Sequence, residues 1–293
     1  MPSTDQRLRD IVNYTPRGRM LANVTRACAL AALCLLFATE VTAQSALAPR
    51  IEHIDSEDGA TFDAHVFDAG AQARRRGAVV LLHGGGWVAG DATWVYPRAR
   101  RFAELGMLTV AVDYRLGNPR FATADARSVI RWLRAHAAEL NIDPNRIAAY
   151  GVSAGGQLSV SAAQGADESA RPNAIVLVSP AVDLERDGWF ARLAGEEAVR
   201  ELSPLTNVRP GLPPTLILQG DVDSETPLPG ARQFCAAMQA NGDRCVLKVY
   251  QGYGHLFTPA GINDRETPQP DAAISAQAGA FAEAFLLNLG YAP

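Results

Sequence analysis

The sequence lacks the features that mark several large classes of protein. Only four of its 293 residues are cysteine, and no Cys/His cluster or HExxH motif has the spacing of a metal site. It contains no G-x-G-x-x-G motif, and no Lys-Ser or Lys-Thr follows its glycine-rich stretch, so a phosphate-cradling loop is not indicated. A net charge of −4 gives no reason to expect a nucleic-acid partner. We therefore expect no metal, no cofactor and no nucleic acid.

The sequence also lacks an apolar run long enough to span a bilayer comfortably. Its N-terminal run Ala27–Ala38 has the length of a signal-peptide core, and the small-x-small triplet Val41-Thr42-Ala43 follows it. The residues before the run include Arg17, Arg19 and Arg26, which form a positive n-region. This pattern predicts a cleaved signal peptide over residues 1–43, a periplasmic or secreted protein, and no stable membrane anchor. A buried helix or an uncleaved anchor is the alternative, and Met20 is an alternative start.

Cysteine is scarce enough for the four residues to be considered one by one. Cys28 and Cys34 fall in the predicted signal peptide, and neither has the residues before it that lipid attachment requires. Cys235 and Cys245 remain in the mature chain. In an oxidising compartment this pair predicts a disulfide that closes a short loop, and two buried thiols are the alternative.

Short apolar segments alternate with helical patterns from residue 50 onward. Segments of strand character lie at 77–86, 106–114, 146–153, 174–182, 214–221 and 245–252, the first ending in a glycine-rich loop. Helical patterns lie at 96–105, 124–140, 154–164, 229–242 and 272–290, with a turn signal at 141–145. Residues 50–70 alternate around an Asp-Gly pair, as an antiparallel hairpin does.

This alternation predicts the fold class. Apolar strands separated by helices indicate an α/β protein, with a mostly parallel central sheet and helices on both faces. The hairpin is expected at the edge of that sheet. No Pro/Gly-rich linker divides the mature chain, so we expect one catalytic domain over residues 44–293.

Ser153 has the sequence context of a nucleophile. It lies in Gly151-Val152-Ser153-Ala154-Gly155, which fits G-x-S-x-G, between a predicted strand and a predicted helix. The turn of a nucleophile elbow is sharp, so residues on either side of its serine must be small, and Gly151, Ala154, Gly155 and Gly156 meet this requirement. The start of the following helix also favours developing negative charge.

The glycine-rich stretch His83–Trp87, "HGGGW", supplies candidate oxyanion donors. It ends an early predicted strand, at the sheet edge where α/β proteins bind ligands. The backbone N–H groups of Gly85 and Gly86 can approach an oxygen closely because no Cβ blocks them. The N–H of Ala154, the residue after the nucleophile, is the third expected donor.

His255 is the candidate general base because it follows the last predicted strand in a glycine-rich loop. The other histidines lie in the hairpin, in the oxyanion stretch and within a helix: His53, His65, His83 and His136. An acid that orients His255 is expected after the strand at 214–221. From the residues alone, three carboxylates stay open for that role: Asp221, Asp223 and Glu225.

At this point the chain resembles a known family. The segments "HGGGW", "DYRL", "GVSAGG", "GDVDSETP" and "GYGHLF" are similar to those of the α/β-hydrolase superfamily, over roughly residues 50–290. The nearest likeness is to bacterial esterases and lipases related to hormone-sensitive lipase, including polysaccharide de-esterifying (acetyl xylan and feruloyl-type) enzymes. The resemblance implies an α/β-hydrolase fold and selects Asp223, four residues before Pro227, as the acid. It also implies that Asp113-Tyr114-Arg115 braces the oxyanion loop.

The sequence departs from that family in two respects. The elbow reads G-V-S-A-G where the relatives usually have G-D-S-A-G. No large cap precedes "HGGGW", and only residues 184–213 lie before the strand at 214–221, so we expect a small or absent cap. Both departures argue against long-chain lipids.

The expected reaction is hydrolysis of short-chain acetyl- or aryl-type carboxylic esters through a Ser-His-Asp triad. The substrate is expected to be a small-molecule or polysaccharide-borne ester, and the oligomeric state stays open. Amide or formamide hydrolysis, as in arylformamidases or peptidases, is the alternative on the same triad. A non-catalytic binding protein of the same fold is a third reading. Three aromatic residues are candidates for the pocket wall or the core: Trp87, Trp189 and Phe190.

Overall fold

The computed structural model describes residues 47–70, 76–265 and 267–292. Residues from Pro49 onward form one compact unit. The predicted signal peptide, its cleavage site and the domain boundary at residue 44 lie outside the described residues and stay predictions. Within the described part, no helix combines the length and the apolarity that a membrane span needs.

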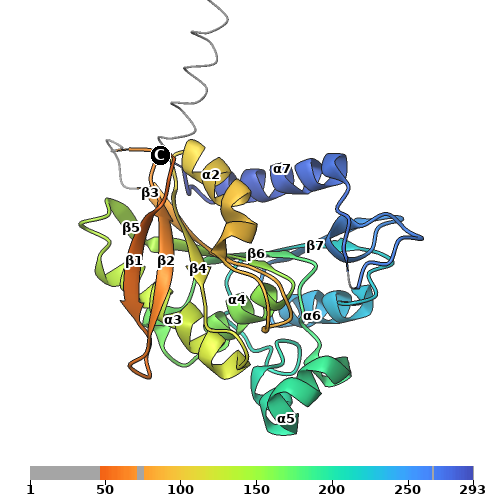
Figure 1. Cartoon of the computed structure of the whole chain (residues 1–293). Coiled ribbons are helices and arrows are strands. Elements are labelled where there is room, and N and C mark those ends of the chain that lie inside the picture. Colours follow the sequence, from red (N-terminus) through yellow and green to blue (C-terminus); the bar gives the residue numbers. More distant parts are fainter. Residues whose placement is uncertain (1–46, 71–75, 266, 293) are drawn as a thin grey trace, which may run out of the picture. The chain divides into compact units, whose positions relative to one another are not determined.

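The compact unit is built on an eight-stranded mixed sheet of order β1-β2-β4-β3-β5-β6-β7-β8 (Figure 1). The strands are β1 (Arg50–Asp55), β2 (Thr61–Phe67), β3 (Arg76–Leu82), β4 (Leu108–Asp113), β5 (Ile142–Val152), β6 (Ala174–Val178), β7 (Thr215–Gly220) and β8 (Cys245–Tyr250). β1 and β2 are antiparallel to each other, and β2 is antiparallel to β4. All other neighbouring pairs are parallel. The predicted fold class and its N-terminal hairpin are confirmed.

Burial explains why some strands have continuous apolar segments in the sequence and others alternate between polar and apolar residues. Every residue of β3, β6 and β7 is buried, because helices cover both faces of the sheet there. In β2, by contrast, exposed or half-buried residues alternate with buried ones over the first six positions. The hairpin turns at Gly59, whose φ of +83° suits glycine. The alternation at 50–70 was therefore the signature of an edge hairpin.

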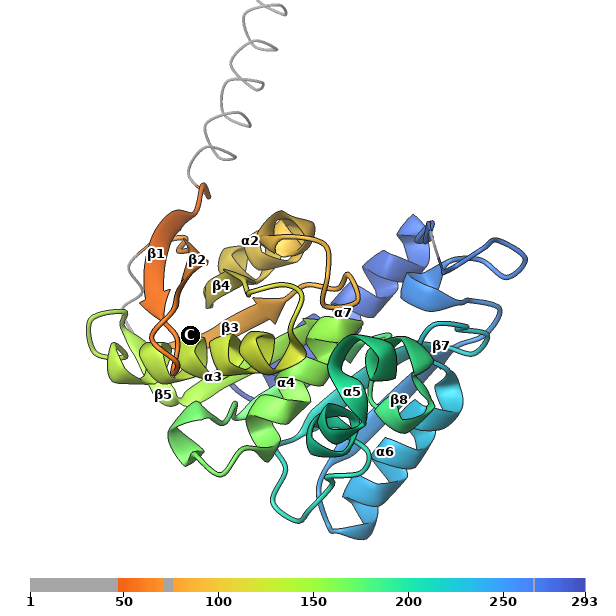
Figure 2. The ribbon, with the colours of Figure 1, turned by 60° about the horizontal axis from the view of Figure 1, so that its bottom comes forward.

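The helices form two layers. α2 (Tyr96–Glu104) and α7 (Ala272–Asn288) cover one face, and an ion pair of 3.0 Å between Arg98 and Glu283 joins them. α3 (Pro119–Ala135), α4 (Ala154–Gln164) and α6 (Leu228–Ala240) cover the other face and stand in front of the sheet in Figure 2. α4 begins with Ala154, Gly155 and Gly156, and these small residues let it pack closely against the centre of the sheet.

The region around α3 differs from its prediction. The helix begins at Pro119, because Asn118 caps it by accepting the N–H of Arg120 at 3.0 Å. It ends at Ala135, before the predicted end at residue 140. The predicted turn at 141–145 is wrong beyond its first residue: Asn141 has φ 51°, but β5 begins at the next position. Strand pairing overrides the turn signal there, because Ile142 pairs with Arg76 of β3 across a register shift.

A helix that the sequence analysis did not predict lies between β6 and β7. α5 (Gly188–Leu202) follows the short 3-10 helix η3 (Leu184–Arg186), and Gly195, with φ 83° and ψ 161°, interrupts it. These elements occupy the segment where a small cap was expected. The start of α5 reaches the candidate site described below.

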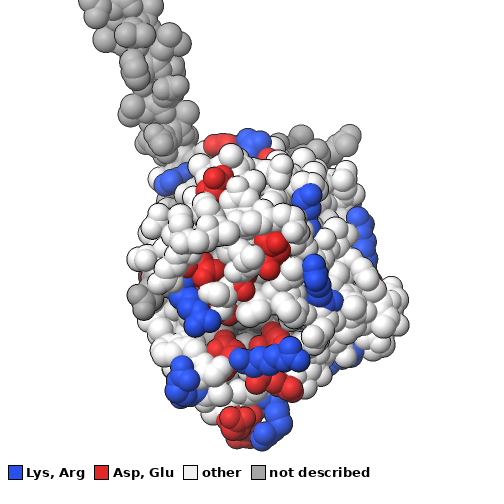
Figure 3. Space-filling model, turned by 90° about the vertical axis from the view of Figure 1, so that its right-hand side faces the viewer, with Lys and Arg blue, Asp and Glu red and all other residues white. Residues whose placement is uncertain are grey.

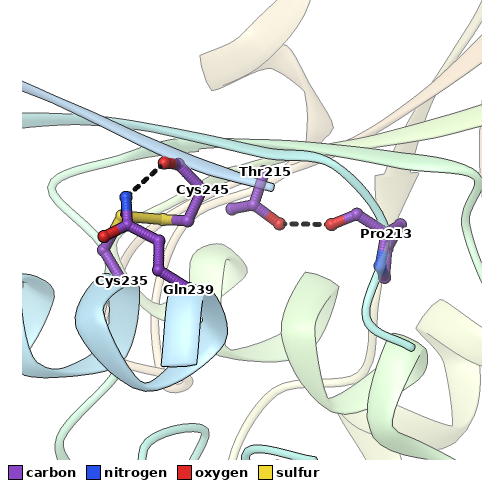
Figure 4. Close-up of a disulfide and its surroundings, with 5 residues drawn as sticks. All are labelled: Pro213, Thr215, Cys235, Gln239 and Cys245. Atoms are coloured by element: carbon purple, nitrogen blue, oxygen red, sulfur yellow. Dashed lines mark hydrogen bonds between the residues drawn. A yellow bond between two sulfur atoms is a disulfide. The ribbon is translucent and has the colours of Figure 1, made fainter. Parts of the chain in front are cut away.

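A disulfide joins Cys235 in α6 to Cys245, the first residue of β8 (Figure 4). Gln239 stands beside it and donates from Nε2 to the carbonyl of Cys245 at 2.8 Å. Cys245 pairs in register with Thr215 of β7, whose hydroxyl donates to the carbonyl of Pro213 at 2.9 Å. The bridge therefore ties α6 to the amino-terminal edge of the sheet, where β7 and β8 begin.

Candidate active site

Ser153 occupies the turn between β5 and α4 in a backbone conformation that few residues adopt. Its φ is 52° and its ψ is −116°. The glycines on either side are required by close packing, because a Cβ on Gly151 would lie 2.3 Å from the carbonyl oxygen of Gly155. A Cβ on Gly155 would lie 2.1 Å from the carbonyl oxygen of Leu82 in β3. The G-x-S-x-G spacing is thus a packing requirement of this elbow, which holds Ser153 half-exposed at the carboxyl edge of the sheet.

The structure brings Ser153, His255 and Asp223 into one hydrogen-bonded row. His255 lies in the short 3-10 helix η4 (His255–Phe257), after β8, and its Nε2 is 3.1 Å from Oγ of Ser153. Its Nδ1 is 3.0 Å from Oδ2 of Asp223. The histidine and the aspartate are both buried. A neutral imidazole that donates from Nδ1 to Asp223 presents a free lone pair at Nε2 to the serine.

Asp223 is held by several donors besides His255. Its carboxylate accepts the backbone N–H groups of Glu225 at 3.0 Å and Thr226 at 2.8 Å. Side chains complete the set, with Nε2 of Gln219 at 2.9 Å and Oγ1 of Thr226 at 3.0 Å. Together these donors occupy both carboxylate oxygens and fix the plane of the group. The acid loop is therefore rigid at the point where it meets the imidazole.

The other two candidate acids lie elsewhere. Asp221 accepts the backbone N–H of Gly252 at 2.7 Å and so joins the ends of β7 and β8. Glu225 stands in the pocket wall, 3.4 Å from Nε of Arg265. Burial raises the pKa of Glu225, and the nearby Asp223 raises it further, against the opposing effects of His255 and Arg265. Of the three carboxylates, the structure places only Asp223 against His255 within the described residues.

The loop that carries His255 is fixed by a residue that the sequence analysis did not identify. Oδ2 of Asp264 accepts the backbone N–H of His255 at 2.7 Å, and the same carboxylate accepts both the backbone N–H and the hydroxyl of Ser224. Burial alone would raise the pKa of Asp264, but these hydrogen bonds outweigh it and hold the pKa below its ordinary value. No local motif surrounds Asp264, so only the fold reveals its role.

The oxyanion loop turns back on itself directly after β3. The carbonyl of Gly85 accepts the N–H groups of Val88 and Ala89, both at 3.1 Å. A trans peptide directs its N–H opposite to its C=O, so this pairing fixes the direction of the Gly86 N–H. Gly85 has φ +108°, and a Cβ there would lie 2.0 Å from the carbonyl oxygen of Ala89. Glycine is therefore needed for the turn that aims the donor.

Tyr114 fixes the preceding peptide. Its hydroxyl lies 2.9 Å from the carbonyl of His83 and 3.2 Å from that of Gly84, and its ring stacks on the His83 imidazole at 4.1 Å. Burial raises the pKa of Tyr114, which keeps the hydroxyl protonated as a donor. Holding the carbonyl of Gly84 also orients the N–H of Gly85. The predicted brace is confirmed for this tyrosine.

The three predicted oxyanion donors line the same pocket as the serine and the histidine. In the part of the chain that the structure describes, the N–H groups of Gly85 and Gly86 donate to no protein acceptor. The pocket has a volume of about 500 Å³, and its wall includes Gly85, Gly86, Ser153, Ala154, Trp189 and His255. Unpaired N–H groups beside a serine hydroxyl form a cradle for a developing oxyanion.

The aromatic candidates divide between wall and core. Trp189 is exposed and lines the pocket, whereas Phe190 is buried and packs on Trp87 with ring centroids 4.8 Å apart. Trp87 touches the pocket but is itself buried, and its Nε1 donates to Gln157 of α4 at 2.9 Å. Phe190 thus belongs to the core, and of the three candidates Trp189 is the one that is exposed in the wall.

The face of the molecule shown in Figure 3 carries both acidic and basic side chains. Acidic and basic side chains stand next to one another there, with no broad patch of one sign. The pocket lining likewise contains charges of both signs, namely Asp187, Glu225 and Arg265. Among the described residues, no group of three or more His, Cys, Asp or Glu side chains is placed to hold a metal ion.

A serine at a strand–helix elbow, followed along the chain by an aspartate and a histidine at the same sheet edge, defines the architecture of an alpha/beta hydrolase. A family model described as the alpha/beta hydrolase fold matches residues 79–209. The solved structure of apo Thermogutta terrifontis esterase 2 superimposes with a TM-score of 0.73 at 32% sequence identity, covering 84% of this chain and 96% of that one. The chain belongs to the alpha/beta hydrolase family.

The curated relatives include two esterases of Mycobacterium tuberculosis, LipM and LipQ. The probable carboxylic ester hydrolase LipM is 31% identical over 184 residues, which cover 52% of this chain and 42% of LipM. Esterase LipQ is 26% identical over 202 residues, which cover 59% of this chain and 48% of LipQ. The chain thus spans less than half the length of either relative.

Proposed function

We propose that this alpha/beta hydrolase is a carboxylesterase-type serine hydrolase that cleaves short-chain acyl esters. The observation that carries the proposal is the row Ser153–His255–Asp223, with distances of 3.1 and 3.0 Å, facing a pocket lined by Gly85 and Gly86. Such a row supplies a nucleophile, a base and an orienting acid. The unpaired loop N–H groups supply the electrostatic stabilisation that acyl transfer requires.

The reaction begins when Oγ of Ser153 attacks the ester carbonyl carbon and its proton passes to Nε2 of His255. The carbonyl oxygen becomes an oxyanion among the N–H groups of Gly85, Gly86 and Ala154. His255 then gives the proton to the leaving alcohol as its C–O bond breaks, leaving an acyl-serine. Water repeats the sequence through His255 and releases the acid. Asp223 stabilises the imidazolium at each stage and stays ionised.

Two observations support a short acyl group. The pocket of about 500 Å³ is bounded on one side by Trp189 at the start of α5, and α5 with η3 is the only described insertion between β6 and β7. Thermogutta terrifontis esterase 2 has been solved with propionate and with butyrate bound, each at 31% identity and a TM-score of 0.72. Export of this chain and a polysaccharide-borne ester stay predictions from the sequence alone.

The test is a p-nitrophenyl ester series, from acetate through butyrate to octanoate and palmitate, with the purified protein. We expect kcat/KM to be highest among acetate, propionate and butyrate. Ser153→Ala should lower kcat by at least about 1,000-fold. Ser169→Ala, which changes an exposed serine in the 3-10 helix η2 (Glu168–Ala170), is the matched control and should leave it unchanged.

Three outcomes would contradict parts of the proposal. Undiminished hydrolysis by the Ser153→Ala protein would remove the assigned nucleophile. A preference for octanoate or palmitate would remove the short-acyl specificity. Faster cleavage of N-formylkynurenine than of any ester in the series would favour the amide or formamide alternative.

A further inference from the structure

Trp189 is bonded to the oxyanion loop as well as lining the pocket. Its indole Nε1 donates to the carbonyl of Gly86 at 3.2 Å, across 103 residues of sequence. The contact is close, because a Cβ on Gly86 would lie 3.3 Å from that same nitrogen. The ring is 45% exposed, so its place is not explained by burial in the core. The indole is therefore directed at the loop by this hydrogen bond.

The next residue of α5 reaches the next residue of the loop. Phe190 is fully buried and packs edge-to-face on Trp87, at 4.8 Å and an interplanar angle of 73°. Two consecutive residues of α5 thus contact two consecutive residues of the oxyanion loop. Trp189 bonds to Gly86, and Phe190 packs on Trp87. The first contact is a hydrogen bond at the pocket wall, and the second is an apolar contact in the protein core.

The first turn of α5 is itself fixed in direction. Asp187 caps the helix, and its Oδ1 accepts the N–H groups of both Trp189 and Phe190 at 3.0 Å. The two aromatic side chains therefore leave a capped turn, from which they diverge towards the loop. This arrangement couples the insertion between β6 and β7 to the donors of the candidate site.

We propose that Trp189 is a positioning residue for the oxyanion hole, acting through the carbonyl of Gly86. The hydrogen bond fixes the peptide that joins Gly86 to Trp87, and the bonds to the Gly85 carbonyl fix the preceding peptide. With the peptides on both sides of Gly86 held, its N–H is kept from rotating away from the oxyanion. The inference rests on the proposed esterase function. An oxyanion exists only in the tetrahedral states, so loss of the hold should lower kcat and leave the binding of the ground-state ester almost unchanged.

The experiment compares tryptophan variants with p-nitrophenyl acetate as substrate. Trp189→Phe keeps an aromatic ring but loses the N–H donor, and we expect kcat to fall roughly three- to tenfold with KM changed by less than about twofold. Replacing Trp189 by benzothienylalanine, in which sulfur takes the place of the indole N–H, should give the same loss of kcat. A trifluoromethyl ketone, which forms a tetrahedral adduct, should lose affinity by the same factor.

Two controls separate positioning from a general effect of losing an indole. Trp94→Phe changes another exposed indole in the same pocket wall, one without a hydrogen bond in the described structure, and should alter KM more than kcat. Trp132→Phe changes a half-buried indole of α3 outside the pocket and should alter neither parameter.

The inference is overturned if the benzothienylalanine protein keeps the full kcat, or if Trp189→Phe and Trp94→Phe change the same parameter by the same factor. Both results require an active wild-type protein. A wild-type protein that hydrolyses no ester would instead overturn the proposed function, and the inference with it.

Discussion

The backbone N–H of His255 donates a hydrogen bond of 2.7 Å to Oδ2 of Asp264, nine residues further along the chain. The same carboxylate accepts from Ser224, which directly follows Asp223. One buried side chain outside the row of three thus joins the loop of the base to the loop of the acid. The distance between His255 and Asp223 depends on this tie as well as on their own contact.

The first prediction concerns Asp264→Asn. The amide can replace only part of the carboxylate's acceptor capacity, so we expect kcat to fall roughly tenfold and unfolding to become about 1–3 kcal/mol easier at neutral pH. The measurements are ester hydrolysis and urea unfolding at pH 7. Wild-type kcat in the variant would show that the triad holds its geometry without this tie.

The lowered pKa of Asp264 also predicts that the stability of the protein depends on pH. Its pKa is lowered in the folded protein, so its stabilisation is present above the pKa of the unfolded chain and is lost as pH falls through the lower folded value. The wild-type protein should therefore lose more stability than Asp264→Asn between pH 6 and about pH 3. Equal losses in urea unfolding of both proteins would exclude this contribution.

The second prediction separates the carboxylates that follow β7. Asp223→Asn should leave the fold intact but lower kcat by about 10⁴-fold, because the amide no longer selects the productive tautomer of His255. Asp221→Asn is the matched control, since Asp221 bonds to the backbone of Gly252 and not to the imidazole. We expect its kcat to stay within about threefold of wild type. The reverse ranking would reassign the acid.

Much of the sheet was predictable because buried parallel strands leave a strong signal. Each of the buried strands β3, β6 and β7 contains a consecutive apolar stretch, and the elbow combines such a strand with small residues that only a sharp turn needs. α5 was missed because Gly188 and Gly195 weaken its helical pattern, and it depends on tertiary contacts. The extent of β5 was missed because its first residue, Ile142, belongs to the strand only by pairing with Arg76.

In the site, the elbow motif identified the nucleophile and the position after the last predicted strand identified the base, while the choice of acid required family resemblance. The hydrogen bonds that position the triad and the oxyanion loop were not predictable from the sequence. Asp264 and Trp189 act through backbone groups 9 and 103 residues away, and Gln219 acts through the side chain of Asp223. No motif in a single sequence marks such bonds. The residues that perform the chemistry can be recognised from sequence motifs, whereas the residues that position them can be recognised only from the folded structure.

The third prediction tests the packing of the elbow. Gly155→Ala places a Cβ 2.1 Å from the carbonyl oxygen of Leu82 and 2.6 Å from that of His83, so β3 and α4 must separate. We expect the free energy of unfolding to fall by about 3 kcal/mol or more. Gly188→Ala is the control, because the nearest atom to its Cβ is the flexible end of Arg192 at 3.4 Å, and it should change stability by less than about 1 kcal/mol. Equal stability of the two variants in urea would contradict the packing account.

The fourth prediction concerns the disulfide between Cys235 and Cys245, which are ten residues apart. Closing a loop of this length restricts the unfolded chain, so the double change to alanine should lower the free energy of unfolding by about 3 kcal/mol. The bridge is attached at the first residue of β8, whereas His255 lies beyond the other end of that strand. The kcat of the double variant should therefore stay within about twofold of the wild-type value at a temperature where both proteins are folded.

Dithiothreitol should lower the Tm of the wild-type protein towards that of the double variant and leave the Tm of the variant unaffected. An unchanged wild-type Tm after full reduction would show that the bond itself adds no stability, and a loss of kcat in the folded variant would show that the amino-terminal edge of the sheet influences the site at the opposite edge.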